Sequence, residues 1–513
     1  MRFALCALCI TAGSAMGMDP AVVLFDQDLL ESPPTGDIRV NLSLFATGLI
    51  GNVDETPQYM PTDMVQIPDG SGRMCVLTLG GVIRLIHADG SLDPVPYLIT
   101  TNEDSYIDPA NFGAISIAFH PDFADPKADG YGRFYVIETE NDTAGVPDFD
   151  GSLLQVSIGG VHHDVLYEYT TTDPSSDTFA GTRRSLMRVE QPGKDHNLFD
   201  MCFGDDGLMF ISSGDGGNQG EGVNLIRQNA GFLGNVFGKI LRIDPLGSNS
   251  DNGQYGVPDD NPFVSTDGAL GEVYSYGHRS PYRLTIDDST GDLWLGEVGQ
   301  QQVEEVNKIV AGGNYGWSTK EGSFIFDQTD FDNNSIDPDS DMNGTGDAAD
   351  ADDLIDPVFE VDHQTARSIT GGFIYQPDDI PGLQGMYIFS DAFGNGLFYG
   401  DPADGSVSGE TGGVQRFQFD PSGVSMPFGT ISIAQDFAGS QYLLAFDGRI
   451  LQINPWGCSS ADFYPDGVLN FLDVSAFLGA YGNQDPDADI NGDTNWNFLD
   501  VSQFLGLYGK GCP

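Results

Sequence analysis

One local pattern recurs along most of this 513-residue chain and constrains its fold more than any other feature. In each copy, Asp, Gly or Ser precedes a short apolar run with β-branched or aromatic residues, which is typical of a turn entering a β-strand. About six copies start roughly 55 to 95 residues apart, as expected for a β-propeller with four-stranded blades. The pattern predicts an all-β fold, a six-bladed β-propeller over residues 40–455, with a β-sandwich pair as the alternative. The runs are Met74–Leu79, Gly132–Ile137, Gly207–Ser212, Gly291–Leu295, Gly385–Phe389 and Ser440–Leu444.

The charge and composition exclude several classes of protein. The chain has 76 Asp and Glu against 21 Lys and Arg, a formal net charge of −55, so its surface repels nucleic acid. Aromatic residues make up 11% of the chain, which excludes a disordered acidic tail. Beyond the N-terminus, no apolar stretch approaches the roughly 18 residues of a transmembrane helix. We therefore expect a folded, acidic protein without a transmembrane segment.

The N-terminal segment predicts secretion. One Arg, an apolar stretch over Phe3–Ile10 and small residues after it are typical of a signal peptide, which we place at residues 1–17. Its removal leaves four cysteines, an even number that permits two disulfides in an oxidising compartment. Cys458 and Cys512 bracket the C-terminal segment and form the first predicted pair. Cys75 and Cys202 are either a second pair or two free thiols.

Residues 457–513 form a separate, duplicated module. The segment Asn470–Gly482 recurs 27 residues later as Asn497–Gly509, and each copy predicts a helix whose apolar face includes Leu472, Phe477, Leu478 and Tyr481 or their equivalents. The loop before the second helix carries oxygen-bearing side chains at the spacing of a twelve-residue calcium loop. Its predicted Ca²⁺ ligands are Asp489, Asn491, Asp493, Asn495 and Asp500. The first copy keeps Asp462, Asp466 and Asp473 but has Tyr464 at the third position, which leaves metal binding there open.

This duplicated loop–helix unit resembles a dockerin, a family in which each calcium loop ends in Asp, as at Asp473 and Asp500. The resemblance implies docking to a cohesin-like or cell-surface protein. A calcium-folded C-terminal cap without a partner is the alternative.

The main candidate for chemistry in the propeller is His196, in the segment Gln191–Asn197. This loop is flanked by Gly and Pro and precedes a predicted strand, a position from which side chains can face a central cavity. A neutral imidazole suits a general base near pH 7, and Asp195 lies beside it in the chain.

Several motifs, in order, resemble the glucose/sorbosone dehydrogenase family over about residues 45 to 455, including its soluble aldose sugar dehydrogenases and its hedgehog-interacting-protein-like branch. These motifs are Ile117–Phe123, Gly132–Val136, Gln191–Asn197, Gly238–Asp244, Pro258–Phe263, Tyr276–Pro281, Glu297–Asn307 and Gly312–Trp317. The fold of that family is a six-bladed propeller, in agreement with the strand pattern.

The resemblance implies an oxidoreductase that uses pyrroloquinoline quinone and Ca²⁺ to oxidise a sugar. By position it gives His196 the role of base, with Asp195 beside it, and gives the cofactor contacts to Arg279, Ser280 and Lys194. It also implies that the backbone carbonyls of Gly299 and Gln300 hold the cofactor's Ca²⁺. Glu305 and the carbonyl of Tyr315 match ligands of a second, structural Ca²⁺.

Departures from the family pattern leave two functions open. Ser280 stands where the cofactor-binding enzymes have Asn, Gly216 replaces a Gln, and several cationic partners of the cofactor's carboxylates are missing. The sequence favours a secreted enzyme that oxidises an aldose sugar or related alcohol and passes electrons to an unknown acceptor. Three states of its cofactor site stay open: the cofactor binds weakly, it contacts Arg279, Lys194 and Arg367 in a rearranged pocket, or the site is empty. The alternative is a non-catalytic propeller that binds a glycan or a protein.

Overall fold

The computed structural model describes residues 30–49, 60–107, 113–149, 162–217, 229–326, 336–341, 354–394, 396–403, 413–421, 423–456, 461–464, 469–491 and 495–509. The predicted signal peptide, Cys458, Cys512, Asp466 and Asp493 lie outside these residues.

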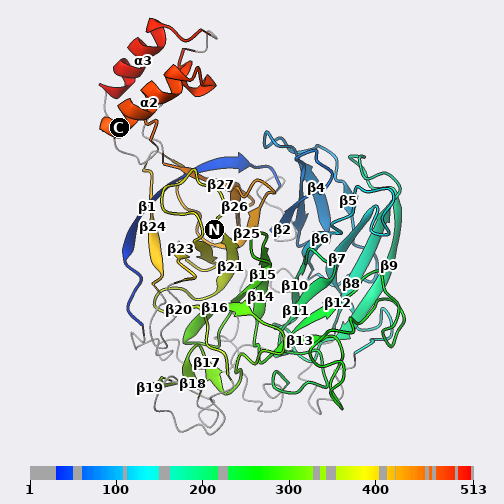
Figure 1. The fold of residues 1–513 in the computed structure, drawn as a ribbon. Helices are drawn as coiled ribbons and strands as arrows, with labels where there is room; N and C mark the ends of the chain where they lie inside the picture. The colour runs from blue at the N-terminus through cyan, green and yellow to red at the C-terminus, as the bar shows by residue number, and fades with distance from the viewer. Residues whose placement is uncertain are drawn as a thin grey trace, which may run out of the picture.

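Four separate antiparallel sheets of four strands each make up much of the fold (Figure 1). The first contains β2 (Pro61–Gln66), β3 (Met74–Thr78), β4 (Val82–Ile86) and β5 (Leu98–Ile99), and the second contains β6 (Ala114–Phe119), β7 (Arg133–Asn141), β8 (His162–Thr171) and β9 (Gly181–Glu190). The third contains β10 (Leu198–Phe203), β11 (Met209–Ser213), β12 (Lys239–Ile243) and β13 (Val273–Tyr276). The fourth contains β14 (Pro281–Asp287), β15 (Asp292–Glu297), β16 (Val303–Ile309) and β20 (Phe359–Asp362).

Eight further strands form one continuous sheet in the order β21-β22-β23-β24-β1-β27-β26-β25. β1 (Thr35–Ala46) joins its two halves, because it pairs in parallel with β24 and antiparallel with β27. The other strands are β21 (Ile369–Ile374), β22 (Tyr387–Asp391), β23 (Leu397–Gly400), β24 (Gln415–Phe419), β25 (Thr430–Gln435), β26 (Gln441–Ala445) and β27 (Ile450–Pro455). A small sheet holds β17 (Lys320–Glu321), β18 (Phe324–Phe326) and β19 (Ile336–Asp341).

The sheets surround a common centre, as in a β-propeller. The strands β2, β6, β10, β14, β21 and β25 contact one another in that order, and β25 contacts β2. The prediction of an all-β, propeller-like fold is confirmed. The prediction of six separate blades is wrong, because β1 pairs on both edges and fuses the strands predicted for the last two blades into one sheet.

The recurrent sequence pattern coincides with the second strand of each four-stranded sheet and with one strand on either side of β1 in the eight-stranded sheet. These strands are β3, β7, β11, β15, β22 and β26. Gly207 and Gly291, in the turns before β11 and β15, have φ of 76° and 76°, a left-handed conformation that a side chain strains. The chain therefore needs Gly where the inner strand turns into the second strand.

Buried charges tie the sheets together at the centre. Arg283 on β14 lies 3.3 Å from Asp200 on β10 and also donates to the carbonyl of Thr62 on β2. Asp63 accepts the backbone N–H of Ile117 on β6 at 2.9 Å. Burial raises the pKa of Asp63 to about 6, with Arg283 opposing that rise and Asp200 adding to it. These contacts link the first strands of four sheets, β2, β6, β10 and β14.

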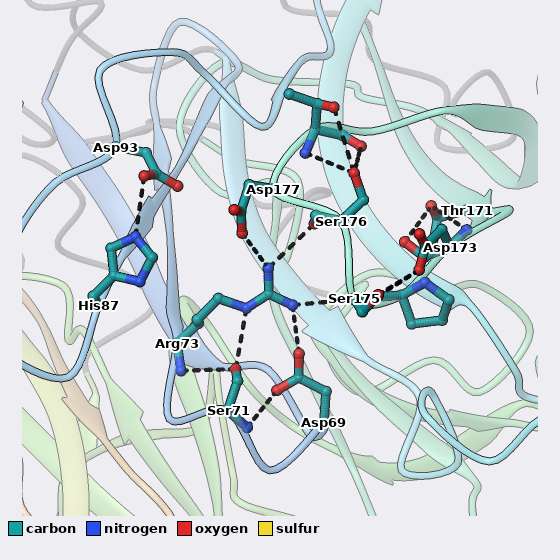
Figure 2. A network of polar contacts seen from close by, with 12 residues as sticks. Asp69, Ser71, Arg73, His87, Asp93, Thr171, Asp173, Ser175, Ser176 and Asp177 are labelled. Carbon is teal, nitrogen blue, oxygen red and sulfur yellow. Dashed lines mark hydrogen bonds and ion pairs between the residues drawn. The ribbon is translucent and has the colours of Figure 1, made fainter.

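A second tie lies at the outer surface between the first two sheets (Figure 2). The guanidinium of Arg73, 6% exposed, binds Asp69 at 2.5 Å within its own turn and Asp177 at 2.7 Å in the β8–β9 loop. It also donates to the backbone carbonyls of Pro174 and Ser176. These contacts fix the two loops against each other.

Cys75 and Cys202 are free thiols, so the pairing considered for them is wrong. They lie on strands of different sheets, β3 and β10, and burial raises the pKa of both thiols. A buried thiol with a raised pKa is a poor nucleophile.

Two short helices, α2 (Phe471–Gly482) and α3 (Phe498–Tyr508), follow the sheets and lie outside the ring in Figure 1, with η4 (Pro486–Ala488) between them in the chain. Each begins at an Asn N-cap with a capping box that is completed by Asp473 or Asp500. The rings of Phe477 and Phe504 stack at 4.1 Å and form the centre of a small core.

The predicted apolar face of these helices is only partly buried. Phe477 and Phe504 are each 1% exposed, whereas other apolar side chains at matching positions of the two copies lie in solvent. These exposed side chains are Phe471, Leu472, Leu478, Phe498, Leu499 and Leu505. In the part of the chain that the structure describes, no helix has the length and apolar character needed to cross a membrane.

Candidate functional site

Two loops of the third sheet bring His196 and Asp215 together. His196 precedes β10 and Asp215 follows β11, and the two strands are antiparallel neighbours. Backbone hydrogen bonds join the loops, from Gly214 N to Asn197 O at 2.8 Å and from Gly216 N to His196 O at 3.2 Å. A Cβ on Gly214 would lie 2.7 Å from the backbone of His196, so this close approach requires glycine.

His196 and Asp215 form a buried acid–base pair. His196 Nδ1 lies 2.5 Å from Asp215 Oδ1, and the two residues are 3% and 2% exposed. Burial alone would raise the pKa of Asp215, but His196, Arg279 and the indole N–H of Trp317 lower it below its usual value. The carboxylate is therefore ionised at neutral pH and can only accept, so Nδ1 of His196 carries the proton. This tautomer leaves Nε2 as a bare acceptor.

Trp317, between β16 and β17, holds the other oxygen of Asp215. Its Nε1 donates to Asp215 Oδ2 at 2.8 Å, across 102 residues of sequence. The Arg279 guanidinium carbon lies 5.7 Å from the centroid of the Trp317 ring, within cation–π range. One indole thus contacts both the carboxylate and the nearest cation of the site.

Arg279 is buried between the third and fourth sheets and is 2% exposed. Its Nη1 donates to the carbonyls of Val298 at 3.0 Å and Gly299 at 2.7 Å, and its Nε donates to Gln300 Oε1 at 2.8 Å. Among the described residues, Arg279 Nη2 and His196 Nε2 are buried polar atoms without a hydrogen-bond partner. Buried polar groups are normally satisfied, so a water molecule or a ligand can bind at these two atoms.

A small cavity of about 20 Å³, room for about one water molecule, opens beside His196, where the first strands of several sheets begin. It lies among Asp195, His196, Phe199, Ser280, Tyr282, Val298, Ser368, Ala392, Ile431 and Phe446. Two aromatic side chains, Phe199 and Tyr282, pack with ring centroids 5.7 Å apart. An apolar cavity with a few polar groups is typical of a small-molecule site.

The predicted site residues are only partly brought together. His196, Asp195 and Ser280 line the cavity, and Arg279 precedes Ser280. Lys194 is exposed beside Asp195. The imidazole of His196 binds Asp215, and the backbone N–H of Asp195 donates to Gly217 O at 3.2 Å, so a catalytic role for Asp195 stays a prediction.

Two of the predicted Ca²⁺ donors of the propeller, the carbonyl of Gly299 and the carboxylate of Glu305, accept hydrogen bonds from the protein, and the side chains of Gln300 and Tyr315 make contacts of their own. The carbonyl of Gly299 and the side chain of Gln300 accept from Arg279, as described above. Glu305 Oε1 accepts from Gly322 N at 2.6 Å, and its Oε2 accepts from Asn307 at 3.1 Å. Tyr315 stacks on His278 at 4.7 Å and donates its hydroxyl to Lys308 O. Within the described ranges, no group of three or more His, Cys, Asp or Glu side chains is arranged to hold a metal ion.

Glu297 supports the site from behind. It accepts from the backbone N–H of Arg279 at 2.5 Å and from His278 Nδ1 at 2.9 Å. Burial, with neighbouring Glu297 adding to it and Lys320 opposing it, raises the pKa of Glu305 to about 8. Two carboxylates on paired strands therefore share a region that holds little positive charge.

In the C-terminal module, Asp473 and Asp500 are fully buried and bind backbone rather than solvent. Asp473 accepts from Tyr464 N at 2.9 Å, and Asp500 accepts from Asn491 N at 3.3 Å. These contacts join the third and twelfth positions of both predicted calcium loops. Asp462, Asp489 and Asn495 lie in the described parts of the loops, where metal ligation by them stays a prediction.

The sequence profile described as Glucose / Sorbosone dehydrogenase matches residues 58–393, the range that contains the site. The chain belongs to this family. Among curated relatives, it is 27% identical over 452 residues to the HIPL1 protein of Arabidopsis thaliana, covering 77% of this chain and 62% of that protein. The chain spans between half and two thirds of the length of the first curated relatives it matches.

Solved structures share the fold. The soluble aldose sugar dehydrogenase of Escherichia coli in its apo form matches with a TM-score of 0.55 and 20% identity, over 81% of this chain and 99% of that chain. The PQQ-bound aldose sugar dehydrogenase of Streptomyces coelicolor matches with a TM-score of 0.50 and 22% identity, over 82% of this chain and 99% of that chain.

Proposed function

We propose that this chain is a secreted oxidoreductase that oxidises an aldose sugar or a related alcohol with pyrroloquinoline quinone. The observation that carries the proposal is the buried, unpartnered Nε2 of His196, set against a cavity by an ionised Asp215. A base of this kind can remove a proton from a hydroxyl held in the cavity. Family membership supports a sugar as the source of that hydroxyl.

The residues around the cavity have the chemistry that the ring system of the proposed cofactor requires, and its binding would widen the cavity. A planar aromatic group with carbonyl oxygens requires flat apolar walls, which Phe199, Tyr282 and Val298 offer. It also requires a donor for its oxygens, and Arg279, next in the chain to the lining residue Ser280, has a buried Nη2 without a partner among the described residues. We assign its carboxylates to Lys194 and Arg367, exposed cations next in the chain to the lining residues Asp195 and Ser368.

The proposed chemistry divides between cofactor and chain. When bound, pyrroloquinoline quinone supplies a hydride acceptor. His196 Nε2 takes the proton of the substrate hydroxyl while the carbon that bears it gives up a hydride, so the CH–OH group becomes a carbonyl. Asp215, ionised and bonded to Nδ1, stabilises the imidazolium that forms. The apolar walls exclude water, which strengthens the electrostatic interactions inside the cavity.

Calcium is a further part of the proposal. We assign one ion to the carbonyls of Gly299 and Gln300 and a second to Glu305 and the carbonyl of Tyr315, on the strength of the family resemblance. Glu305 lies opposite Glu297 on paired strands, and a positive charge there would relieve the repulsion between the two carboxylates.

The test is calorimetric titration of pyrroloquinoline quinone into the purified protein with Ca²⁺, followed by dye reduction with a panel of aldoses. Micromolar or tighter binding with dye reduction supports the proposal. His196→Ala should abolish dye reduction and keep the fold. The matched control is His87→Ala, since His87 is a partly exposed residue that pairs with Asp93 away from the site. Equal turnover by His196→Ala and the control would refute the role of His196.

A second candidate function is a non-catalytic propeller that binds a glycan or a protein. It is favoured by the cavity lining, in which the described residues include no Lys or Arg, while the chain carries a net charge of −55. A cofactor with three carboxylates is disfavoured in such a field unless cations neutralise it. Absence of cofactor binding at millimolar Ca²⁺ would support this candidate.

We also propose that α2 and α3 form a dockerin-like, calcium-binding module that docks on a cohesin-like or cell-surface protein. The exposed Phe471 and Phe498, 78% and 74% exposed at matching positions of the two copies, support a docking face. We further infer that residues 1–17 direct secretion.

A further inference from the structure

We propose that Trp317 is a positioning residue for the His196–Asp215 pair, acting through its indole N–H on Asp215. The inference rests on the proposed role of His196 as a base. Trp317 is not among the residues that line the cavity, so it acts through Asp215 and not by touching substrate.

The two oxygens of Asp215 are held by different donors. Oδ1 accepts from His196 Nδ1 at 2.5 Å and from Gly217 N at 3.0 Å. Oδ2 accepts from Trp317 Nε1 at 2.8 Å, and no other donor to it occurs within the described part of the chain. Without the indole N–H, this buried oxygen would lose its partner and the carboxylate could rotate about its χ2 torsion. Asp215 Oδ1, which fixes the tautomer of His196 by accepting its Nδ1–H, would then no longer point at that proton.

Trp317 is itself held rigidly. Its backbone N–H donates to Gly277 O at 2.9 Å, in the loop that leads to Arg279. Its ring packs against Phe326 at 5.1 Å, in a buried apolar cluster with Ala230 and Val303. The indole is therefore a fixed support that the fourth sheet provides for a base on the third.

The same ring also supports the cation of the site. The guanidinium of Arg279 lies over it at 5.7 Å, and the second nitrogen of that guanidinium, Nη2, has no partner among the described residues. Trp317 thus fixes the positions of the base, His196, and of the donor, Arg279, relative to each other. These positions matter because a misplacement of about 1 Å can lower a rate about 100-fold.

The test compares Trp317→Phe with Trp294→Phe. Both tryptophans are buried, at 6% and 3% exposed, but the Nε1 of Trp294 has no partner in the described structure, so its removal breaks no hydrogen bond. We expect Trp317→Phe to lower kcat by about 10- to 100-fold with KM changed less than about threefold, since a hydrogen bond to a charged acceptor is lost. Trp294→Phe should keep kcat within about twofold.

A double-mutant cycle with Asp215→Ala separates positioning from a structural effect. If Trp317 acts through Asp215, Trp317→Phe should lower the residual rate of Asp215→Ala by less than about twofold. An equal fold-loss in both backgrounds would overturn the inference. If Trp317→Phe does not fold, β-(3-benzothienyl)alanine at position 317 keeps the ring shape and replaces the N–H with sulfur.

A spectroscopic readout keeps the inference testable without turnover. The His196 Nδ1–H bonded to a carboxylate should give a downfield proton resonance, assigned by its loss in His196→Ala. We expect it in the wild type and Trp294→Phe, and expect it broadened or shifted in Trp317→Phe. An identical resonance in all three would overturn the inference. A wild type that shows this resonance but no dye reduction would instead refute the proposed oxidation.

Discussion

Replacement of Asp215 by Asn tests the acid–base pair most directly. Asp215 accepts three hydrogen bonds, from His196 Nδ1, Gly217 N and Trp317 Nε1, and an amide keeps one acceptor oxygen but turns an NH₂ toward one of these donors. If that donor is His196, the imidazole must move its proton to Nε2, and the group that faces the cavity becomes a donor. The base would then be lost without any change in the shape of the site.

The expected size of the effect follows from these contacts. A general base contributes about 100- to 10,000-fold to a rate, so we expect kcat of Asp215→Asn to fall by about 1,000-fold, with KM changed less than about threefold. Loss of a charged acceptor and one broken hydrogen bond should lower the free energy of unfolding by about 2 to 4 kcal/mol. Dye reduction at saturating cofactor, Ca²⁺ and sugar measures kcat, and denaturant unfolding measures stability.

The comparison variant is Asp195→Asn, since Asp195 also lies at the cavity, whereas the imidazole of His196 pairs with Asp215. We expect this variant to keep kcat within about tenfold. Asp215→Asn with more than a third of the wild-type kcat would refute the reasoning, most clearly if Asp195→Asn were the inactive variant.

Three further predictions concern stability. Arg283→Met should lower the free energy of unfolding by about 3 to 5 kcal/mol, because it leaves the buried Asp200 without its cation; a loss below about 1 kcal/mol, as expected for a surface pair, would contradict this. The folded-state pKa of Asp63 lies near 6, above its unfolded value, so the contribution of Asp63 to stability is lost as pH rises from about 4 to about 6. Across that pH range, the free energy of unfolding measured with denaturant should decline less in Asp63→Asn than in the wild type. Parallel curves for the two proteins would contradict this. Phe504→Ala should lower the free energy of opening of α2 and α3, measured by hydrogen exchange, by about 3 to 5 kcal/mol. Leu505→Ser replaces a 55% exposed side chain and should leave that free energy unchanged. Equal effects of the two variants would refute this packing.

The strands could be predicted because their signal is local. A Gly that must adopt positive φ, followed by β-branched and aromatic residues, identifies the second strand of each sheet within a few residues of sequence. The fused eight-stranded sheet could not be predicted from the sequence, because it depends on the pairing of β1 with strands about 400 residues away. Its alternating pattern is the same whether one edge or both are paired.

In the candidate site, too, contacts between residues far apart in the sequence could not be predicted. His196 could be identified from its loop, but its partner lies 19 residues further along, in a Gly-rich segment that the sequence alone presents as a turn. Trp317 is 102 residues beyond Asp215 and lies in a motif that the sequence presents as a packing turn. Such partnerships are set by the approach of two sheets. In the helices, periodicity identified the apolar residues, but not that Leu478 and Leu505 would remain exposed.

The pairing of β1 has a consequence for the order of events during synthesis. Residues 35–46 leave the ribosome among the first of the folded part, yet their antiparallel partner, β27, begins at Ile450. At about 5 to 20 residues per second, β1 must wait about 20 to 80 seconds before that partner exists. Through that time it presents an unpaired edge rich in apolar residues. A nascent chain that carries such an edge is a natural client for a chaperone, and the ring closes only near the end of translation.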